Sequence, residues 1–144
     1  MKIPKKKKPN SKALKKECFS LWSEIIRNRY NNTCIMCGKS KKDGWVVQGH
    51  HAIARAAQGN HARYDIRNGV CLCYTCHIHK VHGRQGDFEF QSKYAQLIDL
   101  IFPDELKESI MIDAKIVIKD KQLPEIKEKL ESILAKEYTD NPIA

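Results

Sequence analysis

The sequence predicts an α+β protein in which a small metal-stabilised unit of two strands and a helix is flanked by helices on both sides. Residues 34–82 hold five of the six cysteines and all six histidines of this 144-residue chain. The same stretch has few large apolar residues, and so small a unit usually needs a metal or disulfides for stability. The segments before and after it carry apolar residues at helical spacing.

The N-terminal region divides into a basic tail and a helix. Residues 1–11 include the run Lys5–Lys8 between two prolines, and we expect this tail to be disordered because like charges repel and proline interrupts regular structure. Residues 12–33 form the second part, with a predicted helix over 12–31. Its apolar face consists of residues that recur at steps of three and four: Leu14, Cys18, Leu21, Trp22, Ile25 and Ile26.

Residues 34–90 form the predicted core unit. Its expected elements are, in chain order, a strand over 45–48, a polar loop over 52–67, a strand over 70–72 and a helix over 77–82. The first strand ends just before His50 and His51, and Gly83 is a typical residue to end the short helix. Both histidines are therefore expected at the end of the first strand.

The sequence predicts a helical extension over residues 91–144. The expected elements are a helix over 91–102, a strand or loop over 110–118 and an amphipathic helix over 124–138. These segments are typical of a supporting cap, and their apolar faces are also candidates for an oligomer interface.

Positive charge is concentrated on the tail and on the Cys/His region. The formal net charge is +9; residues 1–16 contain eight lysines and no acid, and residues 27–84 contain ten Lys/Arg and two acids. Residues 85–144 carry a net charge of −5. A basic region that coincides with metal-binding residue types indicates a polyanionic partner, most simply a nucleic acid.

Two CxxC pairs predict a structural zinc site made by Cys34, Cys37, Cys73 and Cys76. A CxxC turn brings two sulfur atoms to one ion at ~2.3 Å, and two such turns complete a tetrahedron. Cys71 is a rival for Cys73 because the two lie on the same side of a strand. We prefer Cys73, because only it forms a CxxC pair with Cys76, and we expect Cys71 to be a small core residue.

The sequence predicts neither a membrane span nor a signal peptide. No apolar run approaches ~18 residues, and no apolar stretch follows the basic N-terminus. We therefore expect an intracellular protein, in a compartment where thiols stay reduced and CxxC pairs favour metal over disulfide.

The order of residues in the Cys/His region resembles the HNH nuclease family, in its form with two CxxC zinc knuckles. The resemblance covers about residues 34–83 and rests on paired histidines, an asparagine five residues before the second knuckle and a histidine directly after it. It implies a ββα-metal (His-Me finger) core. The wider chain resembles phage recombination nucleases of the NinG/Rap type, through Ile26-Arg27 ahead of a Cys-Ile-x-Cys-Gly segment and through residues 63–69. This second resemblance implies a bacterial or phage-infected host cytoplasm.

The resemblance implies roles for individual residues. His51 corresponds to the general base that activates water, and Asn68 to the asparagine that ties down the loop carrying the base. His50 and His77 correspond to ligands of a catalytic divalent cation. His82 corresponds to the last ligand, although an ideal α-helix would prefer a spacing of four from His77, so His79 remains a competitor. An imidazole-rich site accepts Mn²⁺, Ni²⁺, Co²⁺ or Zn²⁺ as well as Mg²⁺.

The function that follows from the resemblance is a metal-dependent HNH endonuclease that hydrolyses DNA phosphodiester bonds. The candidates for phosphate contacts are Arg55, Arg63, Arg67, Lys80 and Arg84. The alternative is a zinc-stabilised DNA-binding module without catalysis, and structured RNA is a further candidate substrate. The phage-type resemblance implies double-stranded or branched recombination intermediates, whose symmetric cleavage would require a homodimer.

Overall fold

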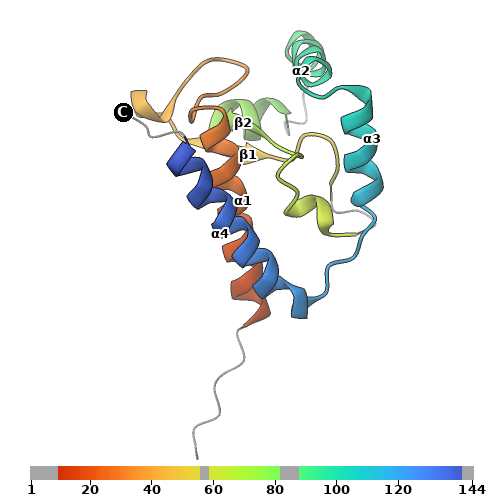
Figure 1. Ribbon diagram of the computed structural model, residues 1–144. Helices are drawn as coiled ribbons and strands as arrows, with labels where there is room; N and C mark the ends of the chain where they lie inside the picture. Colours follow the sequence, from red (N-terminus) through yellow and green to blue (C-terminus); the bar gives the residue numbers. More distant parts are fainter. Residues whose placement is uncertain (1–9, 56–58, 82–87, 141–144) are drawn as a thin grey trace, which may run out of the picture.

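The computed structural model describes residues 10–55, 59–81 and 88–140, which form a small α+β structure (Figure 1). In chain order the helices and strands are α1 (Ser11–Arg29), η1 (Lys41–Asp43), β1 (Val47–His50), η2 (His61–Arg63), β2 (Val70–Cys73), the π-helix η3 (Thr75–Val81), α2 (Phe88–Ile101), α3 (Asp104–Asp113), η4 (Asp120–Gln122) and α4 (Leu123–Asp140). Most of the predicted disordered tail, residues 1–9, lies outside the described residues. No helix in the described part of the chain is both long enough and apolar enough to cross a membrane.

Helix α1 begins and ends slightly earlier than predicted. The side chain of Asn10 accepts a hydrogen bond from the backbone N–H of Lys12, so the helix starts at Ser11, a residue that we had assigned to the tail. Asn31 and Asn32 both adopt the left-handed conformation, with φ of 52° and 51°. Asparagine tolerates this conformation better than most residues, so this pair turns the chain away from the helix before the first CxxC.

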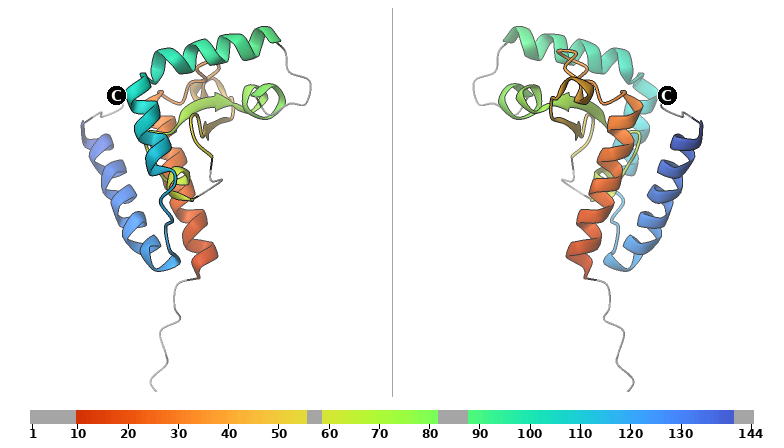
Figure 2. Two further views of the ribbon diagram at one scale, coloured as in Figure 1. Left: turned by 90° about the vertical axis from the view of Figure 1, so that its right-hand side faces the viewer. Right: turned by 90° about the vertical axis from the view of Figure 1, so that its left-hand side faces the viewer.

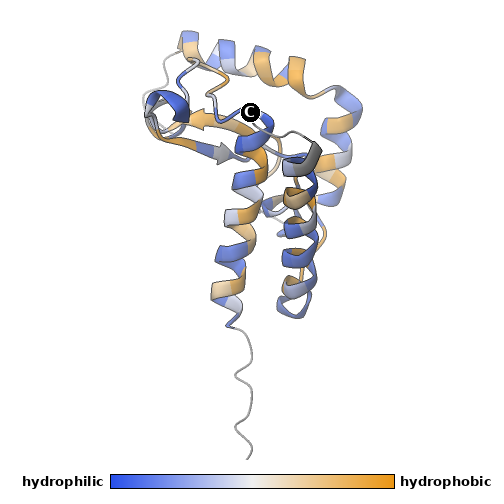
Figure 3. Ribbon diagram, turned by 60° about the vertical axis from the view of Figure 1, so that its left-hand side comes forward, coloured by the Kyte–Doolittle hydropathy of each residue, from blue (hydrophilic) through white to orange (hydrophobic). Residues whose placement is uncertain are grey.

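The two strands form one antiparallel sheet, and helix η3 follows β2 directly. Val47 pairs with Cys73 at one end of the ladder, and His50 pairs with Val70 at the other. All four residues of β2 are buried, and Figure 3 shows this strand as hydrophobic along its length. The first strand starts at Val47 rather than at residue 45, while the second extends to Cys73. The predicted order of strand, loop, strand and helix is therefore present with shifted ends.

Helix α1 lies against this sheet at two glycines. A Cβ atom at Gly49 would come within 3.0 Å of the Trp22 ring, and one at Gly69 would lie 2.6 Å from the side chain of Ile26 and 3.0 Å from Trp22. Trp22, Ile25 and Ile26 are almost completely buried. The absence of a side chain at these two glycines therefore allows the helix to pack directly on the strands.

The helix after the second CxxC is a π-helix, which the sequence pattern did not predict. We expected a helix over 77–82, and the structure has η3 over Thr75–Val81. Hydrogen bonds in a π-helix join residues five apart, and such segments are common at functional sites. The earlier start places Cys76 and His77 inside the helix.

The described part of the C-terminal extension, as far as residue 140, contains three α-helices. Helix α4 runs parallel to α1, with ion pairs from Lys127 to Glu17 and from Arg29 to Glu137, while α2 lies above the sheet in both views (Figure 2). The prediction of a strand or loop over 110–118 was wrong for residues 110–113, which form the end of α3. Apolar residues at the end of this helix recur at a spacing of four, which resembles partial alternation in the sequence. Residues 116–119 do form an irregular segment.

Substitution of Gly69 by Ala should destabilise the fold by about 1–3 kcal/mol, because the new Cβ meets the side chain of Ile26. The cost should shrink in the Ile26→Ala background, where those atoms are missing. Urea unfolding of the four proteins in this double-mutant cycle measures the coupling. Equal costs in both backgrounds would show that the contact between helix and strand does not set the stability.

Candidate functional site

Four cysteines lie close enough together to hold a structural metal ion such as zinc. The sulfur atoms of Cys34, Cys37, Cys73 and Cys76 all lie within 4.8 Å of one another. The Cys37 and Cys73 sulfurs are 3.5 Å apart, near the ~3.8 Å edge of a tetrahedron with zinc–sulfur bonds of ~2.3 Å. Cys71 is fully buried but does not belong to this group, which contains Cys73.

The electrostatics of this cluster suit a cation. Burial raises the pKa of the Cys76 thiol, and the neighbouring Cys73 raises it further. Burial opposes ionisation of Cys73 as well, but hydrogen bonds from the Cys76 backbone and from neighbouring thiols outweigh it, so its pKa is lowered. Four sulfurs at this separation cannot all carry negative charge unless a divalent cation compensates them.

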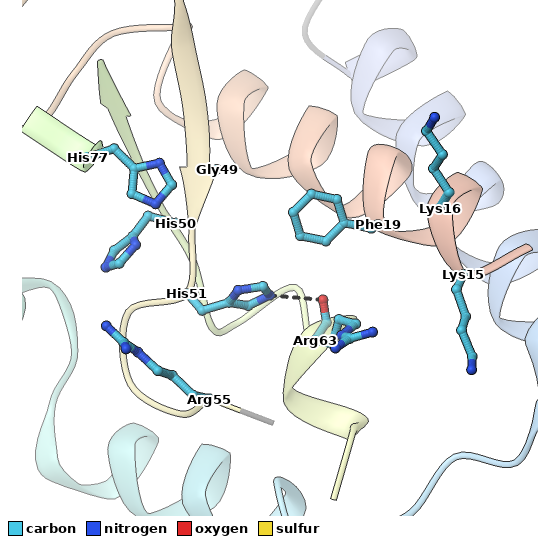
Figure 4. Close-up of a pocket in the computed structure, with 9 residues that line it drawn as sticks. All are labelled: Lys15, Lys16, Phe19, Gly49, His50, His51, Arg55, Arg63 and His77. Atoms are coloured by element: carbon cyan, nitrogen blue, oxygen red, sulfur yellow. Dashed lines mark hydrogen bonds between the residues drawn. The ribbon is translucent and has the colours of Figure 1, made fainter. Parts of the chain in front are cut away.

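A second site is a pocket of about 530 Å³ at the end of β1 (Figure 4). The residues that line it are Lys15, Lys16, Phe19, Gly49, His50, His51, Arg55, Arg63 and His77. None of these residues is acidic, and seven of the nine carry a basic nitrogen. The pocket is therefore suited to an anionic ligand.

His51 points from the strand end toward α1. Its ring stacks on Trp22, with centroids 4.1 Å apart and planes inclined by 16°, and its Nε2 lies 3.1 Å from the carbonyl oxygen of Arg63. A carbonyl only accepts, so Nε2 carries the proton and Nδ1 carries the basic lone pair of the neutral ring. Burial lowers the pKa of His51, opposed by the Arg63 carbonyl and assisted by nearby positive charges, so the ring is neutral at pH 7.

His50 points to the opposite side of the strand end, toward His77 (Figure 4). The two rings meet edge to face with centroids 4.8 Å apart, and His50 is buried. Nδ1 of His77 lies 2.7 Å from the side-chain oxygen of Gln48, which makes Nδ1 the donor and puts the basic lone pair on Nε2. Two imidazoles that share an ion at ~2.1 Å have centroids roughly 4.5–5.5 Å apart, so this pair is suitable for a cation.

Asn68 holds the loop that follows His51. Its Oδ1 accepts hydrogen bonds from the backbone N–H groups of Ile53 and Ala54, at 2.8 and 3.1 Å. Its Nδ2 donates to the carbonyls of Ala54 and Ala62, at 2.8 and 3.1 Å. The side chain is fully buried, and these four bonds satisfy the amide completely.

The predicted phosphate-binding residues fall into separate groups. Arg55 and Arg63 line the pocket. Arg67 lies elsewhere, where it bridges Asp65 and Asp113 with contacts of 2.7 Å to each carboxylate. His82 and Arg84 lie outside the described residues. Residues 79 and 80 belong to η3, but their side chains are not described.

Sequence reasoning missed several contributors to this region. Gln48 stands two residues before His50, so alternation along a strand could have placed it on the face that meets His77. The helical pattern indicates only apolar packing for Trp22 and Tyr94. Tyr94 lies on α2, and its ring centroid is 6.0 Å from that of His50. Burial raises the pKa of Tyr94 to about 12, so its hydroxyl keeps its proton at neutral pH. Lys15 and Lys16 lie on the predicted helix over 12–31, and the sequence pattern gave no sign that they line the pocket.

Comparisons of the chain with protein-family models, with curated proteins and with solved structures found no match.

The cysteine cluster predicts one zinc ion per chain, measured by atomic absorption on purified protein. Cys73→Ala should lose this zinc and unfold at a lower temperature, because three sulfurs cannot complete the tetrahedron. Cys71→Ala is the matched control: the residue lies buried in the same strand, and its removal should leave the zinc content unchanged. Equal zinc content in both variants would contradict the assignment of Cys73.

Asn68→Asp should destabilise the protein by roughly 2–4 kcal/mol, because a carboxylate oxygen would face two backbone carbonyls in a buried position. The exposed Asn31→Asp should change stability by only about 0.5 kcal/mol or less. Urea denaturation followed by circular dichroism measures both. Similar values for the two variants would show that the Asn68 amide does not hold the loop.

Proposed function

We propose that this chain is a metal-dependent endonuclease of the HNH type that hydrolyses phosphodiester bonds of DNA. The observation that carries the proposal is the arrangement at the end of β1. His51 is oriented with a basic Nδ1 on one side, and His50 and His77 face each other on the other side, within a pocket of positive charge.

His51 is the proposed general base. With Nε2–H donated to the Arg63 carbonyl, Nδ1 accepts a proton from a water molecule. The water oxygen forms the new bond to phosphorus, the bond to the leaving oxygen breaks, and that oxygen takes a proton from solvent. The lowered pKa favours this role, because the base must be unprotonated at the start of the reaction.

His50 and His77 are the proposed ligands of the catalytic cation. The donor set fits a borderline or hard divalent ion such as Mn²⁺, Ni²⁺, Zn²⁺ or Mg²⁺. When bound there, such an ion supplies Lewis-acid stabilisation of charge on the phosphate. The chain contributes orientation: Gln48 fixes the tautomer of His77, as carbonyl and carboxylate partners commonly do for histidine ligands.

His82 remains the proposed third ligand. This role comes from the resemblance to the HNH family. His82 itself lies outside the described residues.

The basic side chains around the pocket are the proposed contacts to the DNA backbone. Arg55 and Arg63 come from the loop between the strands, while Lys15 and Lys16 come from the first turns of α1. Such contacts give affinity that depends on salt and not on base sequence. Arg67 is better suited to a structural role, because two carboxylates already engage it.

The proposed substrate class is duplex or branched DNA that arises in recombination, as the phage-type resemblance implies. A homodimer would provide two symmetric cuts in such DNA. Exposed apolar residues of the extension, among them Leu100, Met111 and Ile112, offer a surface for such contact.

The second candidate is a zinc-stabilised DNA-binding module without catalysis. The cysteine cluster and the basic pocket would suffice for it. It gives no reason for the fixed tautomer of His51 or for the pairing of His50 with His77, and therefore we favour the nuclease.

His51→Ala should reduce cleavage of DNA by about 10²–10⁴-fold in Mg²⁺ or Mn²⁺, because general-base catalysis is lost, while DNA affinity stays unchanged. Nicking of supercoiled plasmid and a filter-binding assay measure the two quantities. His61→Ala serves as the control, because His61 is not among the residues that line the pocket. Full cleavage by His51→Ala would remove the base assignment, and binding without cleavage by the unmodified protein in every metal would favour the non-catalytic module.

A further inference from the structure

Tyr94 presents a buried hydroxyl group near the histidine pair. Its oxygen is shielded from solvent and has no hydrogen-bond partner among the residues that the structure describes. A buried polar atom without a partner costs free energy, and such atoms in native proteins are often explained by a catalytic role or by a bound water or ion. A phenylalanine would fill the same space without this cost.

Tyr94 packs against the core and lies beside His50, which lines the pocket. The residue lies on α2, and its ring meets that of His50 edge to face, with centroids 6.0 Å apart. His50 in turn faces His77 at 4.8 Å. The charge of Arg55, which lines the pocket, acts on the same hydroxyl. Figure 4 shows the Arg55 side chain reaching back toward the side on which His50 lies.

The C-terminal extension therefore meets His50 through the ring of Tyr94. Phe90 on the same helix already provides buried apolar packing one turn earlier. A tyrosine hydroxyl both donates and accepts hydrogen bonds, and oxygen atoms bound to a cation, from water or from phosphate, are partners for such a group.

We propose that the hydroxyl of Tyr94 hydrogen-bonds an oxygen atom that is bound to the cation held by His50 and His77. This inference rests on the proposed cation site. The oxygen belongs to a water molecule when DNA is absent and to a phosphate group when DNA is bound. Tyr94 is thus a positioning residue of the cation site, supplied by the helical extension and not by the strand-strand-helix unit.

The test compares Mn²⁺ binding by the full-length, zinc-containing protein and its Tyr94→Phe variant, with free Mn²⁺ measured by electron paramagnetic resonance. Partners of this kind commonly change metal affinity by about 10–100-fold, and we expect a loss of about tenfold. The measurement is repeated with a non-cleavable phosphorothioate duplex, which separates a water partner from a phosphate partner. The proposal predicts a loss in both conditions. A loss only without DNA would support it with water as the one partner, and a loss only with DNA would support it with phosphate as the one partner.

Two further variants make the result interpretable. Tyr30→Phe removes a hydroxyl that donates to the Gly69 carbonyl at 3.4 Å, and it should leave Mn²⁺ affinity unchanged. His77→Ala should abolish Mn²⁺ binding and thereby locate the ion.

Without Mn²⁺, Tyr94→Phe should melt at the same temperature as the unmodified protein or higher, because an unpaired hydroxyl has been removed. Mn²⁺ should raise the melting temperature of Tyr94→Phe less than that of the unmodified protein.

The outcomes distinguish the role of Tyr94 from the existence of the cation site. Equal Mn²⁺ affinity of the unmodified protein and Tyr94→Phe, with and without DNA, overturns the role of Tyr94 while the proposed nuclease stands. Absence of Mn²⁺ binding by the unmodified protein overturns the cation site and with it this role.

Discussion

The packing of Trp22 on the two-stranded sheet is the interaction on which the pocket depends. Strands of four residues do not form a stable sheet alone, so another element must hold them. Trp22 lies against Gly49 and Gly69, donates from Nε1 to the carbonyl of Asp65 at 2.8 Å and stacks on His51. One side chain of α1 thereby fixes both strands, the intervening loop and the orientation of one imidazole.

Side chains hold the described parts of the loop between the strands. Asn68 binds its first half, and Asn60 binds the backbone of Ile118 through both amide atoms. Arg67 connects Asp65 to Asp113 on α3. The loop that carries Arg55 and Arg63 is therefore braced on one side by the sheet and on the other by the C-terminal extension.

The sequence allowed prediction of what depends on local spacing. The CxxC pairs were enough to choose Cys73 over Cys71, and strand alternation was enough to place His50 and His51 on opposite sides. Contacts between distant segments could not be predicted: a helical pattern shows that Trp22 is buried but not that it meets His51. The π-helix was missed for a different reason, since hydrophobic periodicity over seven residues does not distinguish a π-helix from an α-helix.

The proposed chemistry requires two imidazoles whose protons are placed before any ligand arrives. The backbone carbonyl of Arg63 receives the proton of His51, and the side-chain oxygen of Gln48 receives that of His77. Each acceptor belongs to an element that the sheet or its loop holds in place, so the basic nitrogens Nδ1 and Nε2 are selected by the fold. Because His50 and His51 diverge at the strand end, the proposed proton acceptor and the proposed cation ligands would approach a phosphate from different directions. That separation would keep the proposed base from becoming a third metal ligand, and it would give a physical reason for placing the two proposed functions on adjacent residues of one strand.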